Sequence, residues 1–187
     1  MTVTVRRETA ADVPAAREVV RAAFGGDKVP CLLDALRESV AWLDLSFVAE
    51  LEGEIVGHVS YTRAWVDAPD RVVDVLVLSP LSVRPDAQRR GVGRALVEQS
   101  LDVVRGRDDP VVFLEGDPAY YRRIGWQPAG RWGFTAPSVR IPEPAFQAVL
   151  LPPYDSLDPK PRGALVYPDV FWRHDCVGLR EEPSGTP

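Results

Sequence analysis

A glycine turn rich in arginine, running from Gln88 to Arg94 (QRRGVGR), has the residue types of a site for an anion. Amides at the start of a helix have no carbonyl partner and carry the positive end of the helix dipole. Gly91 and Gly93 lack a Cβ, so a phosphate oxygen could approach the backbone closely. Between residues 84 and 94 four arginines stand against one acid, a local net charge of +3 in a chain of net charge −5. The alternative is an ordinary helix start with solvated arginines.

The elements that flank this turn predict a strand before it and a helix after it. Residues 72–83 are apolar and largely β-branched without regular alternation, which is typical of a buried strand. Pro80 within this run predicts a bulge or a gap in the pairing. After the turn, one broad helical face gathers apolar side chains. These are Val92, Leu96, Val97, Leu101, Val103 and Val104.

Two nucleotide-binding motifs fit the turn poorly. A Walker loop requires Gly-Lys-Ser/Thr, and none follows here. A dinucleotide fingerprint requires a third small residue, where this chain has Leu96, and expects the turn in an opening βαβ unit. Glu115 lies near the spacing of the ribose-binding acid, so the dinucleotide interpretation is weakened without being excluded.

A second stretch, residues 115–126, carries a tyrosine motif. Asp117 precedes Pro118, which is typical of a helix cap followed by proline at the first helical position. We therefore expect a short helix over about 118–123, ended by Gly125. Tyr121 stands four residues before this glycine, and Trp126 follows it.

Taken together, the two stretches resemble the GNAT superfamily of N-acetyltransferases. Gln88-x-x-Gly91-x-Gly93 after a strand is similar to the acyl-CoA loop of that family, and Tyr121-x-x-x-Gly-Trp resembles its Tyr-x-x-x-Gly-Phe. The resemblance covers roughly residues 3–151. The Gly-Asp-Pro-Ala-Tyr-Tyr block, with a late Tyr167-Pro-x-x-Phe171, resembles a small branch of predicted bacterial N-acetyltransferases of unsettled substrate.

The resemblance implies an α/β GNAT fold, with a mixed central sheet of six to seven strands flanked by about four helices. It implies one domain over 3–180, with its core at 3–151 and a polar tail at 181–187. The implied cosubstrate is acetyl-CoA. In the family the loop amides bind its pyrophosphate, and the backbone of the preceding strand pairs with its pantetheine. The resemblance also implies that residues 22–36 border the acceptor. The implied acyl-CoA residues are Leu81, Val83, Gln88, Arg89, Arg90, Gly91, Val92, Gly93 and Arg94.

The other segments predict further elements along the chain. After a helix that Gly25 and Gly26 end, we expect a helix over about 31–40 with Val40 facing inward. A hairpin of 47–51 with 54–61 and a strand at 111–114 follow the alternation and the turn residues. A last pair of strands is expected at 132–134 and 145–151, then a proline-rich loop over 152–163 and a short strand at 164–167.

The implied chemistry is direct attack of a primary amine on the acetyl thioester in a ternary complex. An alkyl ammonium, with a pKa near ~10, must first lose a proton, and a thiolate of pKa about 8.5 needs one back. Tyr121 is the candidate acid, with core packing as the alternative, whereas Tyr120 is expected to pack or to line a ligand. Residues 75–83 contain no acid, unlike many members, so Glu115 is the candidate base, and water or desolvation of the amine stays open.

Composition limits the other classes. The sequence pI near 5.1 argues against nucleic-acid binding, and no apolar run approaches the roughly 20 residues needed to span a bilayer. A cytoplasmic protein without a signal peptide is expected. The cysteines and histidines lack metal-ligand spacing, so no metal is expected, and His174-Asp175-Cys176 carries the letters of a triad by coincidence. A non-catalytic acyl-CoA-binding module is the alternative function, and a homodimer is possible.

Overall fold

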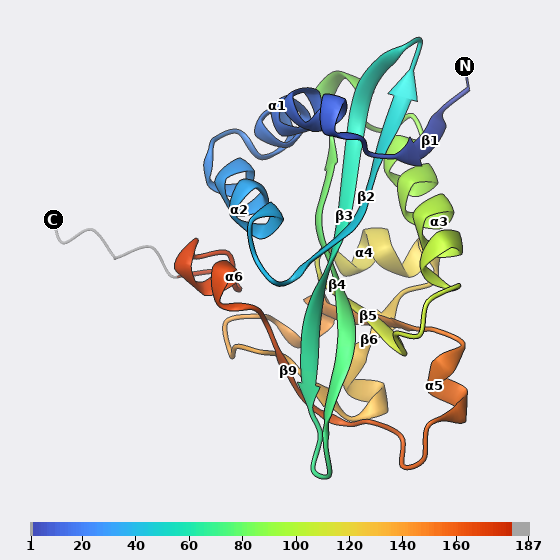
Figure 1. Ribbon diagram of the computed structural model, residues 1–187, viewed down its shortest axis with the longest axis vertical. Coiled ribbons are helices and arrows are strands. Elements are labelled where there is room, and N and C mark those ends of the chain that lie inside the picture. Colours follow the sequence, from blue (N-terminus) through green and yellow to red (C-terminus); the bar gives the residue numbers. More distant parts are fainter. Residues whose placement is uncertain (1, 181–187) are drawn as a thin grey trace, which may run out of the picture.

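The structure, a computed structural model, describes residues 2–180 and contains one mixed sheet of nine strands. Seven strands form a continuous path in the order β1-β2-β3-β4-β5-β8-β6, and the short β7 and β9 join it beside β3 (Figure 1). The α/β class with a mixed central sheet is confirmed; within residues 2–180 the sheet has nine strands where six to seven were expected, because β7 and β9 add to the path, and there are six α-helices where about four were expected. The strands are β1 (Thr4–Arg7), β2 (Trp42–Leu51), β3 (Glu54–Asp67), β4 (Val72–Val83), β5 (Val111–Glu115), β6 (Gln127–Pro128), β7 (Phe134–Thr135), β8 (Phe146–Leu150) and β9 (Gly163–Val166).

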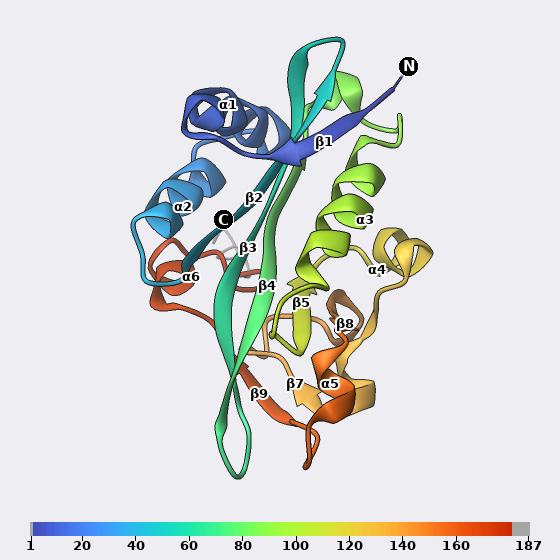
Figure 2. The ribbon, with the colours of Figure 1, turned by 45° about the vertical axis from the view of Figure 1, so that its right-hand side comes forward.

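Helices cover both faces of the central strands. Helices α1 and α2 lie on one side and α3 lies on the other, so each face has its own apolar core (Figure 2). The α-helices are α1 (Val13–Phe24), α2 (Lys28–Arg37), α3 (Val92–Val104), α4 (Pro118–Tyr121), α5 (Pro153–Ser156) and α6 (Asp169–Arg173). No helix in residues 2–180 is long and apolar enough to cross a membrane.

Helix α2 begins at Lys28, before its expected start near residue 31, and a serine ends it early. Ser39 places both its N–H and its hydroxyl on the carbonyl of Leu36, so the helix stops at Arg37. Val40, expected to face inward, is instead 88% exposed. On α3, Val103 is likewise 42% exposed, whereas the other predicted apolar positions of that helix are buried.

The central strands part in the middle of the sheet. β4 and β5 run parallel, but only Leu76 with Val112 and Val77 with Phe113 are paired. Beyond these pairs the strands diverge, which opens the sheet beside the second half of β4. The two pairs therefore mark where the gap begins.

A bulge in β4 lies next to this gap. Val59 pairs with Leu81 and Tyr61 pairs with Leu78, so Ser79 and Pro80 together face the single residue Ser60. The hydroxyl of Ser60 donates to the Ser79 carbonyl at 2.8 Å. The prediction of a bulge at Pro80 is confirmed.

The C-terminal third departs most from expectation. The strand expected at 132–134 is mainly a 3-10 turn over Ala129–Trp132, which Gly133 ends at φ +81°, leaving a two-residue β7. The expected loop over 152–163 contains α5, and α6 follows β9 without having been predicted. The polar tail expected at 181–187 lies outside the described residues.

Candidate active site

The glycine turn forms a hollow at the start of α3. Gly91, at φ +83°, is the N-cap of α3. Because glycine has no side chain, it accepts no hydrogen bond from the first amides of the helix, which begins at Val92. The hollow measures about 360 Å³. Its walls include eight of the nine expected acyl-CoA residues, Arg90 being the exception, together with Tyr120. We call it the loop hollow.

Its positive charge is smaller than the sequence suggests. Arg84 pairs with Glu54 at 3.1 Å and with Asp86 at 2.7 Å, and it does not line the loop hollow. Arg94 pairs with Glu98 at 2.8 Å, one turn along the helix. Exposed pairs of this kind are worth little, so a phosphate could displace Glu98 from Arg94.

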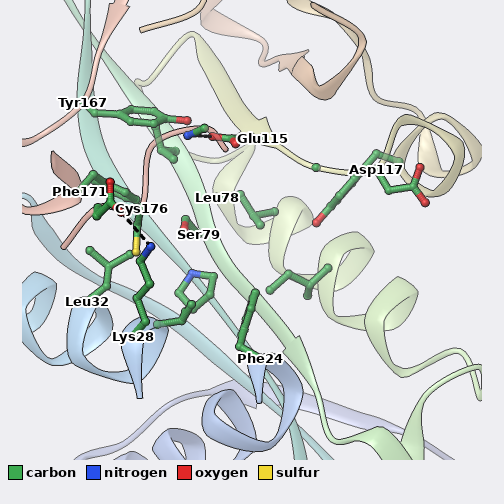
Figure 3. A pocket seen from close by; sticks show the side chains of 18 residues that line it. Phe24, Lys28, Leu32, Leu78, Ser79, Glu115, Asp117, Tyr167, Phe171 and Cys176 are labelled. Carbon is green, nitrogen blue, oxygen red and sulfur yellow. Dashed lines mark hydrogen bonds and ion pairs between the residues drawn. The ribbon is translucent and has the colours of Figure 1, made fainter. Parts of the chain in front are cut away.

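A second and larger cavity, of about 450 Å³, lies where β4 and β5 part, and we call it the strand-gap pocket (Figure 3). Its walls come from the α1–α2 corner, the β4 bulge, the end of β5, the start of α4 and the C-terminal segment 167–178. Leu81 lines both the strand-gap pocket and the loop hollow. The two hollows are therefore neighbours along β4.

Tyr121 lines the strand-gap pocket and is 9% exposed. Its ring meets the edge of Trp126 at a centroid distance of 5.8 Å, which fixes its position. A Cβ at position 116 would collide with this ring, so Gly116 is needed for the close approach. Burial raises the pKa of Tyr121, and the phenol therefore keeps its proton.

Tyr120 lines the loop hollow. A Cβ added at Gly93 would lie 2.7 Å from the Tyr120 hydroxyl, so this phenol stands directly at the glycine turn. Burial raises the pKa of Tyr120 as well. The placement agrees with the expected role in packing or ligand lining.

Glu115 ends β5 inside the strand-gap pocket, beside Tyr167 (Figure 3). Its Oε2 accepts a hydrogen bond from the Gly178 N–H at 3.1 Å. Burial raises the pKa of Glu115 against the opposing effects of this hydrogen bond and of Arg140. A carboxylate with a raised pKa is a stronger proton acceptor than an ordinary one.

The adjacent His174, Asp175 and Cys176 do not form a triad. The thiol of Cys176 lies 3.3 Å from the backbone carbonyl of His174, not from its ring. The carboxylate of Asp175 pairs with Lys28 and Arg180. Burial raises the pKa of the Cys176 thiol, so this side chain lacks the thiolate that nucleophilic catalysis requires.

Several pocket residues were missed by sequence reasoning. Phe24, Lys28 and Leu32 fall within residues 22–36, which were expected to border the acceptor only by resemblance. Tyr167 and Phe171 were noticed as part of a branch pattern, without a place in the site. No local pattern indicates that Gly178 reaches Glu115, because the contact joins residues 63 positions apart.

Comparison with known proteins identifies the family. A family model described as "Acetyltransferase (GNAT) domain" matches residues 4–129, about two thirds of the chain. The chain belongs to the GNAT acetyltransferase family. The protein is therefore an acyltransferase, and the recognition from the loop and tyrosine motifs is confirmed.

Bacterial relatives of this GNAT acetyltransferase include proteins crystallised with CoA. The uncharacterized N-acetyltransferase YjhQ of Escherichia coli is 38% identical over 129 residues, which cover 68% of this chain and 71% of YjhQ. The structure of Escherichia coli YhbS in complex with CoA has a TM-score of 0.80 at 28% identity, covering 91% of this chain and 92% of YhbS. A Brucella melitensis GNAT acetyltransferase in complex with acetyl-CoA has a TM-score of 0.70 at 28% identity, covering 91% and 98%.

Proposed function

We propose that this protein transfers the acetyl group of acetyl-CoA to a primary amine by direct attack in a ternary complex. The observation that carries the proposal is the adjacency of the two hollows through Leu81. One hollow offers helix-start amides for phosphate, and the other holds a protonated phenol and a carboxylate at the gap between β4 and β5.

The chain offers a consistent set of groups for acetyl-CoA. The amides of Val92, Gly93 and Arg94 suit the pyrophosphate, because they begin α3 without a capping side chain from Gly91. β5 pairs with β4 only at Leu76 and Val77, so no strand of the described chain lies beside Leu81 and Val83 on the gap side, which suits backbone pairing with the pantetheine there. CoA and acetyl-CoA in two related structures support this assignment.

The reaction of the neutral amine needs two proton transfers in the pocket. The amine reacts in its neutral form, after its ammonium proton has passed to water. Its nitrogen attacks the thioester carbonyl carbon and gives up a second proton to Glu115, directly or through water. The C–S bond then breaks, and the departing thiolate takes the proton of the Tyr121 hydroxyl, leaving an amide and the free thiol of CoA. Return of the proton from Glu115 to the Tyr121 phenolate through water restores both groups.

The raised pKa of Glu115 suits the transfer from the amine nitrogen. Burial keeps Tyr121 in the neutral form that the transfer to the thiolate requires, and the same burial makes its phenol a weaker acid toward the thiolate.

A non-catalytic acyl-CoA-binding module is the second candidate. It is favoured by one observation, that residues 75–83 of β4 carry no acid. Such a module would bind acetyl-CoA with no need for a proton donor at the gap. The presence of Tyr121 and Glu115 in the strand-gap pocket favours the enzyme.

Release of CoA thiol from acetyl-CoA, measured with a set of primary amines, tests the proposal. We expect release that depends on the amine, together with an acetylated amine detected by mass spectrometry. Tight binding of acetyl-CoA with no release for any amine would favour the binding module. Failure to bind acetyl-CoA would contradict both candidates.

A further inference from the structure

The C-terminal segment forms one wall of the strand-gap pocket and gives it the size of a small-molecule site. β9 holds this segment on the sheet through pairs such as Trp65 with Val166, and residues 167–178 then pass over the gap. Tyr167 and Phe171 are 5% and 2% exposed, so this wall is firmly packed. A cavity of about 450 Å³ is in the range of small-molecule sites.

The walls of the pocket are mainly apolar and aromatic. Phe24 and Leu32 stand on the helix side, with Phe171 close to Leu32, while Leu78 lies on the strand side and Tyr167 above (Figure 3). Aromatic rings on opposite sides suit a flat or branched apolar group, because the transfer of its apolar surface from water into the pocket is favourable. A long polar chain would leave its hydrogen-bonding groups without partners here.

The charges of the pocket favour a cation and disfavour an additional carboxylate. Among the described lining residues Lys28 is the only basic one, and its ammonium lies 3.3 Å from the carboxylate of Asp175. Asp117 caps α4 through the Ala119 N–H at 2.8 Å. Glu115 has the Gly178 N–H as its hydrogen-bond partner, so this carboxylate keeps acceptor capacity for a ligand ammonium.

We infer that the acceptor is a small primary amine with an aromatic or branched apolar body and no carboxylate, bound with its nitrogen toward Glu115 and its body between Phe24 and Phe171. This inference rests on the proposed acetyl transfer. The C-terminal wall of the pocket then helps to select the acceptor. Its residues Tyr167, Phe171 and Gly178 lie outside residues 4–129, which the family model matches.

Four amines test the inference, and three of them form matched pairs. Phenylethylamine and phenylalanine differ by one carboxylate, and propylamine has a methyl group where phenylethylamine has the phenyl ring. In the thiol-release assay we expect kcat/KM for phenylethylamine to exceed that for phenylalanine and that for propylamine by about tenfold or more, as expected for a lost apolar group or an unpaired buried charge. Spermidine, a polar polyamine, should be poorer than phenylethylamine.

A variant at the mouth of the pocket checks where the ring binds. Phe24 is 52% exposed, so Phe24→Ala should leave the fold intact. We expect it to lower kcat/KM for phenylethylamine about fivefold to tenfold while leaving that for propylamine and the KM for acetyl-CoA unchanged. Val40→Ala, an exposed apolar position outside the strand-gap pocket, is the control and should change none of these.

The outcomes separate this inference from the proposed function. Preference for phenylalanine or spermidine, equal rates for all four amines, or an unchanged Phe24→Ala would overturn the acceptor class while acetyl transfer stood. No thiol release with any amine, despite binding of acetyl-CoA, would overturn the proposed function and with it this inference.

Discussion

The rings of Tyr120 and Tyr121 meet edge to face, with centroids 4.9 Å apart and planes at 88°. Although the two residues are adjacent in α4, Tyr120 lines the loop hollow at the glycine turn, and Tyr121 lines the strand-gap pocket between β4 and β5. The two rings thus lie between the hollow that suits the phosphates of CoA and the pocket that suits the acetyl transfer. It also supplies a matched set of variants, because each ring can lose its hydroxyl with little change in packing.

Tyr121→Phe should abolish most turnover and spare acetyl-CoA binding. The phenylalanine ring keeps the contact with Trp126, whereas the proton donor is lost. We expect kcat to fall by about a hundredfold or more, the lower range for general acid catalysis, with Kd for acetyl-CoA within about twofold. Steady-state kinetics with an accepted amine and calorimetric titration with acetyl-CoA measure the two effects.

Tyr120→Phe is the control for this experiment and should retain a kcat within a few-fold of wild type. A Tyr121→Phe enzyme that turns over an accepted amine at the wild-type rate would remove Tyr121 from the acid role. Its place in the pocket would then be that of an aromatic wall.

Gly93→Ala should weaken acetyl-CoA binding without unfolding the protein. The new methyl group would lie 2.7 Å from the Tyr120 hydroxyl, so this ring must move within the loop hollow that it lines. We expect Kd to rise about tenfold, roughly 1.4 kcal/mol of binding free energy. Gly26→Ala, where an added Cβ meets no atom within 4 Å, is the control. Wild-type affinity in Gly93→Ala would contradict the assignment of the glycine turn.

Glu115→Gln should change the pH dependence of the reaction. If Glu115 takes the proton, kcat/KM rises with pH through the pKa of Glu115, which burial places above its ordinary value. Glutamine cannot titrate, so the variant should lose the inflection of the profile that belongs to Glu115 and retain only the rise at about pH 10 that comes from deprotonation of the amine itself. An inflection at the wild-type pH that persists in Glu115→Gln would assign the base role to another group or to water.

Glu8→Gln should destabilise the fold beneath α2. The Glu8 side chain is 3% exposed, accepts from Arg37 at 2.5 Å and lies 3.3 Å from Nε2 of His58. Burial acts to raise the pKa of Glu8, but the hydrogen bond with His58 and the charges of His58 and Arg37 outweigh it and lower the pKa. Removing one partner of a buried pair costs about 3 kcal/mol, which urea unfolding at pH 7 measures.

The pH dependence of this loss has a definite sign. A lowered pKa in the folded state stabilises the fold above the unfolded value, about 4.3, and this contribution is lost as pH falls through the folded pKa. The difference between wild type and Glu8→Gln should therefore shrink below about pH 4. Glu38→Gln, at an exposed position, is the control and should change stability by less than about 0.5 kcal/mol. A Glu8→Gln difference that grows on acidification would contradict this account.

The parts of the site that sequence predicted are those set by local patterns. The apolar run of β4, its bulge at Pro80 and the glycine turn each follow from residue types within a few positions. The cap of α4 is equally local, since Asp117 accepts from the Ala119 N–H as expected. The order of these elements then indicated the family and the fold.

The walls of the strand-gap pocket could not be predicted in this way. They depend on β9 pairing with β3 and on Gly178 reaching Glu115, contacts between residues far apart in the chain. Proline-rich composition at 152–163 indicated a loop, but it carried no information about α5 or about where the chain goes next. The two-residue β7 forms only because β9 lies beside it.

Thermal unfolding with acetyl-CoA, CoA and NAD tests most directly the central claim, that the glycine turn and the gap between β4 and β5 bind acyl-CoA. A ligand at about 100 times its Kd adds roughly 2.7 kcal/mol to stability, which for a domain of this size raises Tm by about 5–10 °C. We predict such a rise with acetyl-CoA and CoA, none with NAD, and a smaller rise for Gly93→Ala. An unchanged Tm with both CoA species at millimolar concentration would contradict the account.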